Sequence, residues 1–240
     1  MKSKLLGIAV LFLAAACSTT APATSDVSGI DCVFLQLKSG PRAALVSKEE
    51  AQSVFAGHFA NMQRLAGERK LLVAGPYGAP KRDAELRGIF VLDVPGTDEA
   101  AALARTDPGV IAGVFRTEQV RMRTWAPLRE HLEQELAIEA KAKAEGRVRD
   151  PGEGGRGFVW LTAEKGRQAR QALADLEGVL LWGDLADGRG LALLDAKDLD
   201  ACGKLLEGRG EKIGPHVLDP WFGSGELVQL PEMARAHSGQ

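Results

Sequence analysis

His58 is the residue of this sequence best placed to do chemistry. At about 100° per residue around a helix, it shares one narrow sector with four apolar residues, Val54, Phe55, Met62 and Leu65. An imidazole on a face packed against a sheet can take up or release a proton near neutral pH and act as a general acid or base. The alternative is a packed histidine bonded to backbone or water, because an unpaired buried polar group costs about 1–3 kcal/mol.

Other familiar chemistries have no signature in the sequence. The four histidines (58, 131, 216 and 237) show no metal-ligand spacing with cysteine or carboxylate, so we expect no metal and no cofactor. There is no Gly-x-Ser-x-Gly motif and no dinucleotide fingerprint. The glycine-rich stretch RDPGEGGRG, residues 149–157, lacks the Lys-Ser/Thr ending of a phosphate loop and precedes a strand. A net charge of −2 without a basic face argues against a nucleic-acid partner.

Residues 1–17, MKSKLLGIAVLFLAAAC, have the form of an export signal. A basic start is followed by an apolar run too short for a lasting membrane span, and then by small residues. Cys17 after three alanines resembles the lipobox of bacterial lipoproteins, in which the peptide is cut before the cysteine and the cysteine is acylated. Ser18 in place of aspartate then implies the periplasmic face of the outer membrane. The alternative is a plain secretory signal with a chance cysteine.

Residues 18–29, STTAPATSDVSG, are small and polar and predict a flexible tether. Two further cysteines follow, Cys32 and Cys202. In an oxidising envelope they could form a disulfide, but their distance in the sequence says nothing of their distance in space. The sequence favours two small core residues.

The elements that would position His58 alternate between strand and helix. We expect strands at 32–37, 71–75, 87–94 and 112–125, and helices at 47–70 and 97–107. Ser47 and Glu50 have the S-x-x-E spacing of a capping box, which marks the start of the first helix. The order βαββαβ is the ferredoxin-like arrangement, in which two helices cover one face of a sheet.

The same order returns after a charged segment. Residues 127–147 predict a helix that is charged nearly all round, which we take as a solvated connector. Beyond it we expect strands at 158–163, 179–183, 190–196 and 216–222, and helices at 165–178 and 198–208. The chain then divides into domains 30–128 and 156–231, a helical linker 129–155 and a tail 232–240.

The two halves can be aligned, which indicates a duplication. KLLVAG matches VLLWGD with Leu71 on Leu180, and IFVLDVPGTDEAAAL matches LALLDAKDLDACGKL with Asp93 on Asp195. The offset falls from 109 to 102, so the second copy has a loop seven residues shorter. A sheet with helices on one face must cover its other face. We therefore predict an α+β fold in which two ferredoxin-like units form an intramolecular dimeric α+β barrel.

The first half resembles the YciI-like (YCII-related) family. The features that carry the resemblance are His58, Ala74-Gly75-Pro76, Asp107-Pro108 and Ala112-Gly113-Val114, in this order and spacing. The resemblance covers residues 30–127 well and 156–231 weakly. Members are usually small ferredoxin-like proteins that dimerise as α+β barrels. Arg69 departs from the family, which usually has glycine before the strand.

The resemblance implies a catalytic pair of His58 and Asp107. Asp107 would hold one ring nitrogen of His58 and turn the other toward a pocket for a small-molecule ligand. Gly75, Pro76 and Tyr77 are the residues that we expect to bind this ligand. The alternatives are that Asp107 only marks a helix end before proline and that Tyr77 only caps its strand. Arg87 could bind an anion, although a solvated loop charge is the simpler interpretation.

The repeat predicts a single site. At the offsets above, His58 corresponds to Arg167 and Asp107 to Arg209, so the second half has lost the pair. It would then replace a dimer partner for the first half. Two functions remain open: a small-molecule enzyme using His58 and Asp107, or a non-catalytic envelope lipoprotein that binds a ligand or protein partner through the barrel scaffold, held at the membrane by its lipid anchor.

Overall fold

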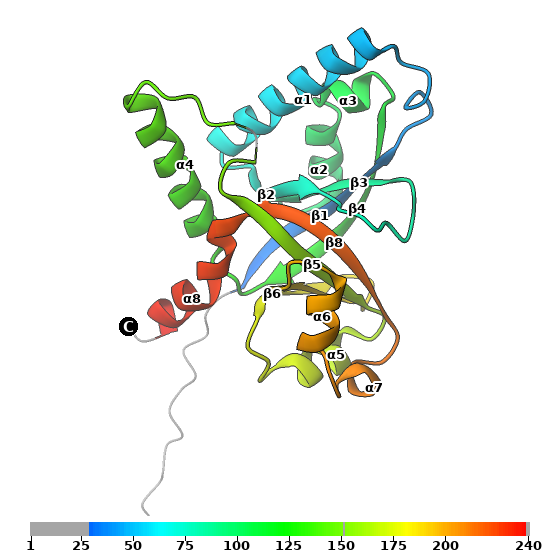
Figure 1. The fold of residues 1–240 in the computed structure, drawn as a ribbon, viewed down its shortest axis with the longest axis vertical. Helices are drawn as coiled ribbons and strands as arrows, with labels where there is room; N and C mark the ends of the chain where they lie inside the picture. The colour runs from blue at the N-terminus through cyan, green and yellow to red at the C-terminus, as the bar shows by residue number, and fades with distance from the viewer. Residues whose placement is uncertain (1–28, 151, 239–240) are drawn as a thin grey trace, which may run out of the picture.

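The computed structural model describes residues 29–150 and 152–238, in which the order βαββαβ occurs twice, as predicted (Figure 1). The first half comprises β1 (Ile30–Ser39), α1 (Lys48–Gly67), β2 (Leu71–Pro76), β3 (Leu86–Leu92), α2 (Thr97–Ala104), α3 (Pro108–Ile111) and β4 (Phe115–Thr124). The second half comprises β5 (Gly155–Ala163), α5 (Gly166–Leu173), β6 (Val179–Leu185), β7 (Gly190–Leu194), α6 (Leu199–Leu205), α7 (Gly210–Ile213) and β8 (His216–Ser224).

Three further helices lie outside these halves. The long helix α4 (Leu128–Ala144) joins them, and a 3₁₀ helix η1 (Gly225–Gln229) and helix α8 (Leu230–Ser238) follow β8. Most of α8 lies in the segment 232–240, for which the sequence suggested only a tail. None of the helices in the described part of the chain combines the length and hydropathy of a membrane span. The predicted signal peptide, with Cys17, and most of the tether lie outside the described residues.

All eight strands form one antiparallel sheet that closes on itself as a barrel. Their order is β2-β3-β1-β4-β6-β7-β5-β8, so β4 of the first half pairs with β6 of the second. The outermost strands meet where Tyr77 is bridged to Trp221 and the Gly78 N–H donates to the Pro220 carbonyl at 2.7 Å. The fold is therefore α+β, and the two halves share one barrel, which confirms the prediction.

Large apolar side chains from both halves fill the barrel. Phe34 of β1 and Trp160 of β5 meet edge to face with ring centroids 5.7 Å apart, and Trp160 meets Trp221 of β8 at the same distance. Helices α1–α3 cover the outside of the first half and α5–α7 that of the second (Figure 1). Cys32 lies in the barrel core and Cys202 on the buried face of α6, both are free, and they form no disulfide.

Helix α1 begins and ends as its sequence indicates. The Ser47 hydroxyl accepts the N–H of Glu50 at 3.1 Å, as an N-cap residue does. After the helix, Arg69 has a φ of +56°, the left-handed conformation that favours glycine. This is the position at which the resemblance would place a glycine. The Arg69 guanidinium instead reaches the Glu133 carboxylate of α4, at 2.8 and 3.1 Å.

Helix α4 is not the solvated connector that its charges suggested. Its inner face buries Leu128, His131 and Leu132, and the helix packs against β2 and η1. Arg129 donates to both carboxylate oxygens of Asp93, at 2.6 and 2.9 Å. The prediction was wrong because a narrow apolar stripe is enough to anchor a helix whose other faces are charged.

We expect Leu132→Ala to lower the free energy of unfolding by about 2–4 kcal/mol. Leu132 is 4% exposed, and truncating a buried leucine loses both its transfer free energy and the contacts around the cavity left behind. Urea denaturation followed by circular dichroism measures the change. The control is Lys141→Ala on the exposed side of the same helix, which should change the value by less than about 0.5 kcal/mol. Equal losses in both variants would contradict the packing role of α4.

Candidate functional site

His58 and Asp107 are joined by a hydrogen bond. His58 Nδ1 lies 2.7 Å from Asp107 Oδ2, and the two residues are only 7% and 1% exposed. A carboxylate oxygen accepts and cannot donate, so Nδ1 carries the hydrogen. The other ring nitrogen, Nε2, is then the atom available to take up a proton. The geometry is the one that the resemblance implies, and the catalytic role of the pair stays a prediction.

Asp107 is held in place by the start of α3. Its Oδ1 accepts the N–H of Gly109 at 2.7 Å, which makes Asp107 the N-cap, and Pro108 follows at the first helical position. Asp107 therefore marks a helix boundary with one oxygen and orients His58 with the other. The close approach of α1 to α3 requires Gly57, because a Cβ there would lie 2.9 Å from the Pro108 ring.

Polar contacts from α1 fix the loop that carries Asp107. Arg64 Nη2 donates to Asn61 Oδ1 at 2.8 Å and to Thr106 Oγ1 at 2.9 Å. Thr106 directly precedes Asp107, and Asn61 lies one turn after His58 on the same helix. The helix that presents the imidazole thus also positions the carboxylate that orients it.

Aromatic rings enclose the His58 imidazole. Phe90 of β3 stacks on it, with centroids 5.9 Å apart and planes 13° apart, and Phe115 of β4 meets it edge-on at 5.2 Å. Phe55 and Phe59, on either side of it along α1, have centroids 6.4 and 5.6 Å away and are 41% and 44% exposed. The helical periodicity placed Phe55 beside His58, but it could not reveal Phe90 and Phe115, which reach the ring only through the tertiary packing of β3 and β4 against α1.

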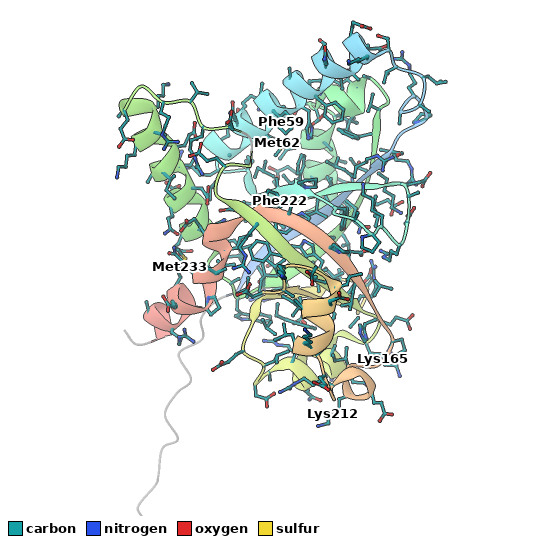
Figure 2. The ribbon with its side chains drawn as sticks, viewed as in Figure 1. Phe59, Met62, Lys165, Lys212, Phe222 and Met233 are labelled. Atoms are coloured by element: carbon teal, nitrogen blue, oxygen red, sulfur yellow. The ribbon has the colours of Figure 1, made fainter. Side chains whose placement is uncertain are left out.

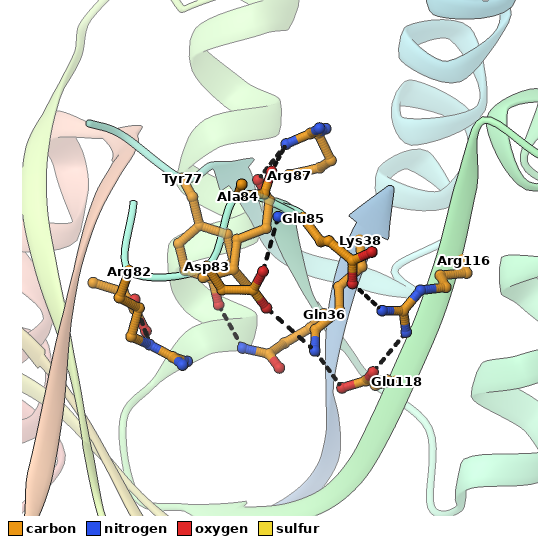
Figure 3. Close-up of polar contacts among 12 residues, drawn as sticks. Gln36, Lys38, Tyr77, Arg82, Asp83, Ala84, Glu85, Arg87, Arg116 and Glu118 are labelled. Carbon is orange, nitrogen blue, oxygen red and sulfur yellow. Dashed lines mark hydrogen bonds and ion pairs between the residues drawn. The ribbon is translucent and has the colours of Figure 1, made fainter. Parts of the chain in front are cut away.

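A cavity of about 160 Å³ opens beside His58, between α1 and strands β2 and β3. Leu37, Met62 and the four phenylalanines make most of its lining. Arg87 also lines it, and its Nη1 donates to the carbonyls of Ala84 and Leu86 at 2.7 and 3.0 Å (Figure 3). Arg87 is therefore a residue of the cavity lining, not only a loop charge.

Two of the three predicted ligand-binding residues line this cavity. Gly75 and Pro76 do, whereas Tyr77 turns into the barrel, because successive residues of a strand point to opposite faces. The Tyr77 hydroxyl accepts from Gln36 Nε2 at 2.8 Å (Figure 3). Burial raises the pKa of Tyr77 well above its ordinary value. Gly75 has no room for a side chain, since a Cβ would lie 2.1 Å from the Phe222 carbonyl oxygen of β8.

The strand register corrects the alignment of the two halves. Leu71 pairs with Leu92 in the first half and Val179 with Leu194 in the second, so the offsets are 108 and 102. The sequence alignment matched Leu71 to Leu180 instead, because it was based on identical residues and strand register cannot be read from the sequence. The loop before the third strand is consequently six residues shorter in the second half, not seven.

With this register, the counterpart of His58 is Gly166 and not Arg167. A Cβ on Gly166 would lie 2.9 Å from backbone atoms of the turn before β7, so main chain occupies the space where the imidazole would extend. Arg209 begins α7 as Asp107 begins α3, as the alignment predicted. The described part of the second half therefore holds no copy of the pair.

The other described histidine side chains lie apart from the pair. His131 is buried in α4, and His216 at the start of β8 has Nδ1 2.7 Å from the Gly214 carbonyl. Within residues 29–150 and 152–238 no group of three histidine, cysteine, aspartate or glutamate side chains is arranged to hold a metal ion.

The barrel of two βαββαβ halves has the fold of dimeric α+β barrel proteins. Residues 34–126, which carry His58 and Asp107, match the model of the YCII-related domain. No curated protein sequence matches the chain.

Solved structures resemble the chain in fold. A mutant chlorite dismutase from Candidatus Nitrospira defluvii aligns with a TM-score of 0.50 and 10% identity, over 85% of this chain and 95% of that one. A protein assigned as a monooxygenase from Lactobacillus acidophilus NCFM aligns at 0.41 and 7% identity, over 82% and 97%. A second protein assigned as a chlorite dismutase aligns at 0.46 and 11%, over 84% and 98%. At these identities the likeness concerns the fold alone.

Proposed function

We propose that the YCII-related half is a small-molecule site in which His58 acts as general acid–base group and Asp107 orients it. The observation that carries the proposal is the 2.7 Å hydrogen bond between His58 Nδ1 and Asp107 Oδ2 beside a cavity. An imidazole fixed in one tautomer by a buried carboxylate has its second nitrogen free for proton transfer. The reaction class is thus proton transfer to or from a bound molecule.

The cavity limits what this molecule can be. Its volume of about 160 Å³ is close to the ~150 Å³ of an engineered apolar cavity that holds benzene, so a single ring or a body of that size fits. Phenylalanine side chains dominate the lining, and Arg87 adds one cationic group. The chemistry favours a mostly apolar molecule with one polar group at the reacting atom.

Proton exchange tests the proposed activity. The wild-type protein is incubated in D₂O with a panel of single-ring ketones, and NMR measures deuterium gained at the carbon next to the carbonyl. Exchange faster than in buffer supports a proton-transfer site. Saturable binding at His58 without deuterium exchange for any ketone would favour a second function, non-catalytic binding.

That second function is non-catalytic binding of a ligand or protein partner through the barrel scaffold. One observation supports it: the second half keeps the fold while Gly166 and Arg209 stand where the pair would be. The fold therefore does not depend on the site. We also propose that the second half takes the place of a dimer partner, since the strands of both halves lie in one sheet.

We further propose that the chain is exported and anchored at the periplasmic face of the outer membrane through acylated Cys17. Residues 1–17 support this by their signal-peptide pattern. In a bacterial host we expect Cys17→Ser to abolish labelling by radioactive palmitate and to move the protein from the membrane to the soluble fraction. Cys32→Ser is the control, because Cys32 is buried in the barrel and should leave both readouts unchanged. Membrane recovery of Cys17→Ser would contradict the anchor.

A further inference from the structure

His131 is a buried histidine for which the fold supplies no hydrogen-bond partner. It lies on the inner face of α4 and is 2% exposed. Among the described residues, Nδ1 is enclosed and makes no hydrogen bond, whereas Nε2 is not one of the enclosed atoms. An unpaired buried polar group is unfavourable, so a histidine in this position calls for a partner that the chain itself does not provide.

The His131 ring is neutral at ordinary pH. Burial lowers the pKa of His131 to about 4, and the carboxylate of Glu226 offsets only part of that effect. A neutral imidazole offers one N–H donor and one lone-pair acceptor. The two nitrogens point to opposite sides of the ring, so one bound group meets only one of them, and a group that can both donate and accept pairs with either tautomer.

A cavity of about 240 Å³ adjoins His131, where α4 runs beside η1 (Figure 1). Its lining is mainly apolar, with Met62 (Figure 2) and Ala66 of α1, Leu132 of α4 and Leu227 of η1. α1, β2, α4, β8 and η1 all contribute to it, so it is built from the two halves and their connector. Met62 also lines the His58 cavity, so the two cavities adjoin but have different polar groups.

The charges around the cavity disfavour an ionic occupant. Glu135 lines it, accepts a hydrogen bond from the Ser224 hydroxyl and lies 3.9 Å from the Arg149 guanidinium. This carboxylate is already engaged, and its negative charge opposes an anion. A cation would have to give up its hydration against the apolar lining and a neutral imidazole.

We propose that this cavity binds a small neutral molecule with a mostly apolar body and one hydroxyl group, and that His131 is the residue that recognises the hydroxyl. A hydroxyl can donate to a bare ring nitrogen or accept from its N–H, so it pairs with an accessible nitrogen in either tautomer of the neutral ring. The volume suits a single ring with a one- or two-carbon arm, larger than the benzene held in a cavity of about 150 Å³. The proposal does not rest on the activity proposed for His58.

Benzyl alcohol and ethylbenzene are the matched probes, because they differ only by a hydroxyl in place of a methyl group. With the full chain, NMR of the histidine ring signals is expected to show benzyl alcohol shifting His131 saturably. Ethylbenzene is expected to bind about three- to tenfold more weakly, the value of one hydrogen bond. Benzoate should not shift His131. Equal affinity for the two neutral probes, or no shift of His131 at all, would overturn the proposal.

Three variants show which of the two cavities binds the probes. His131→Phe should remove the preference for benzyl alcohol over ethylbenzene, and Ala66→Leu, which fills the cavity from α1, should abolish binding of both probes. Ala66→Leu keeps the test decisive if His131→Phe fails to fold. His58→Gln should leave the affinity for benzyl alcohol unchanged. Binding that survives Ala66→Leu and is lost in His58→Gln would assign the probe to the other cavity and refute the proposal.

Discussion

Replacing His58 by glutamine is expected to slow the proposed proton transfer by about 10²–10⁴-fold, the usual contribution of a general acid–base group. The glutamine amide can still donate a hydrogen bond to Asp107, so the contact that joins α1 to α3 is kept. What the variant loses is a nitrogen that gains and releases a proton. The rate of deuterium exchange measures the loss, and circular dichroism checks that the fold is retained.

His216→Gln is the matched control for this substitution. His216 is partly buried at the start of β8 and lies near the Gly214 carbonyl, in the second half of the barrel and away from the His58 cavity. The same chemical change there should leave the exchange rate as in the wild type. An unchanged rate in His58→Gln, or equal losses in the two variants, would remove His58 from the chemistry.

The fold could be predicted because local signals and the repeat pointed the same way. Ser47 and Glu50 marked the start of α1, and Asp107 before Pro108 marked the end of the second helix, although the short helix α3 that begins there was not predicted. The duplication then added what one half cannot show, since two one-sided sheets must cover each other. The histidine on the apolar face of α1 was visible for the same reason, as helical periodicity places a residue on a face.

The features that could not be predicted from the sequence depend on strand register and tertiary packing, which a sequence pattern does not encode. The pairing of β2 with β3 and of β6 with β7 fixes an offset of 108 between the halves, whereas matching like residues gave 109 and placed His58 on Arg167. Strand alternation sends Tyr77 into the barrel, but the face of β2 that meets α1 is known only once the sheet is built. The charges of α4 likewise concealed its buried face.

The two buried histidines differ in what the fold gives them. His58 has a carboxylate partner, aromatic neighbours and a cavity, so its ring is oriented by the chain. His131 has a cavity and no hydrogen-bond partner among the described residues. The arrangement around His58 suits repeated proton transfer. The arrangement around His131 suits recognition, because a ring without a hydrogen-bond partner in the fold can form its hydrogen bond with a bound molecule.

Acid is expected to destabilise the protein through His131, by ~3 kcal/mol between pH 6.5 and pH 4. Burial lowers the pKa of His131 from 6.5 to about 4 in the folded protein, while the unfolded chain keeps the ordinary value. Above pH 6.5 neither state is protonated and the full stability is present. As the pH falls, the unfolded state takes up the proton first, so the free energy of unfolding decreases until the folded state is protonated near pH 4.

Comparing the wild type with His131→Phe isolates this effect. Urea denaturation at a series of pH values gives the free energy of unfolding of each protein. Other titratable groups change the free energy of unfolding equally in the wild type and in His131→Phe, so their contributions cancel in the difference. Among them, burial raises the pKa of Asp219, and hydrogen bonds lower the pKa values of Glu153 and Asp175. The difference curve should be flat above pH 7 and should slope between pH 6.5 and pH 4. A curve without that slope would mean that His131 titrates alike in both states and is not buried as a neutral ring.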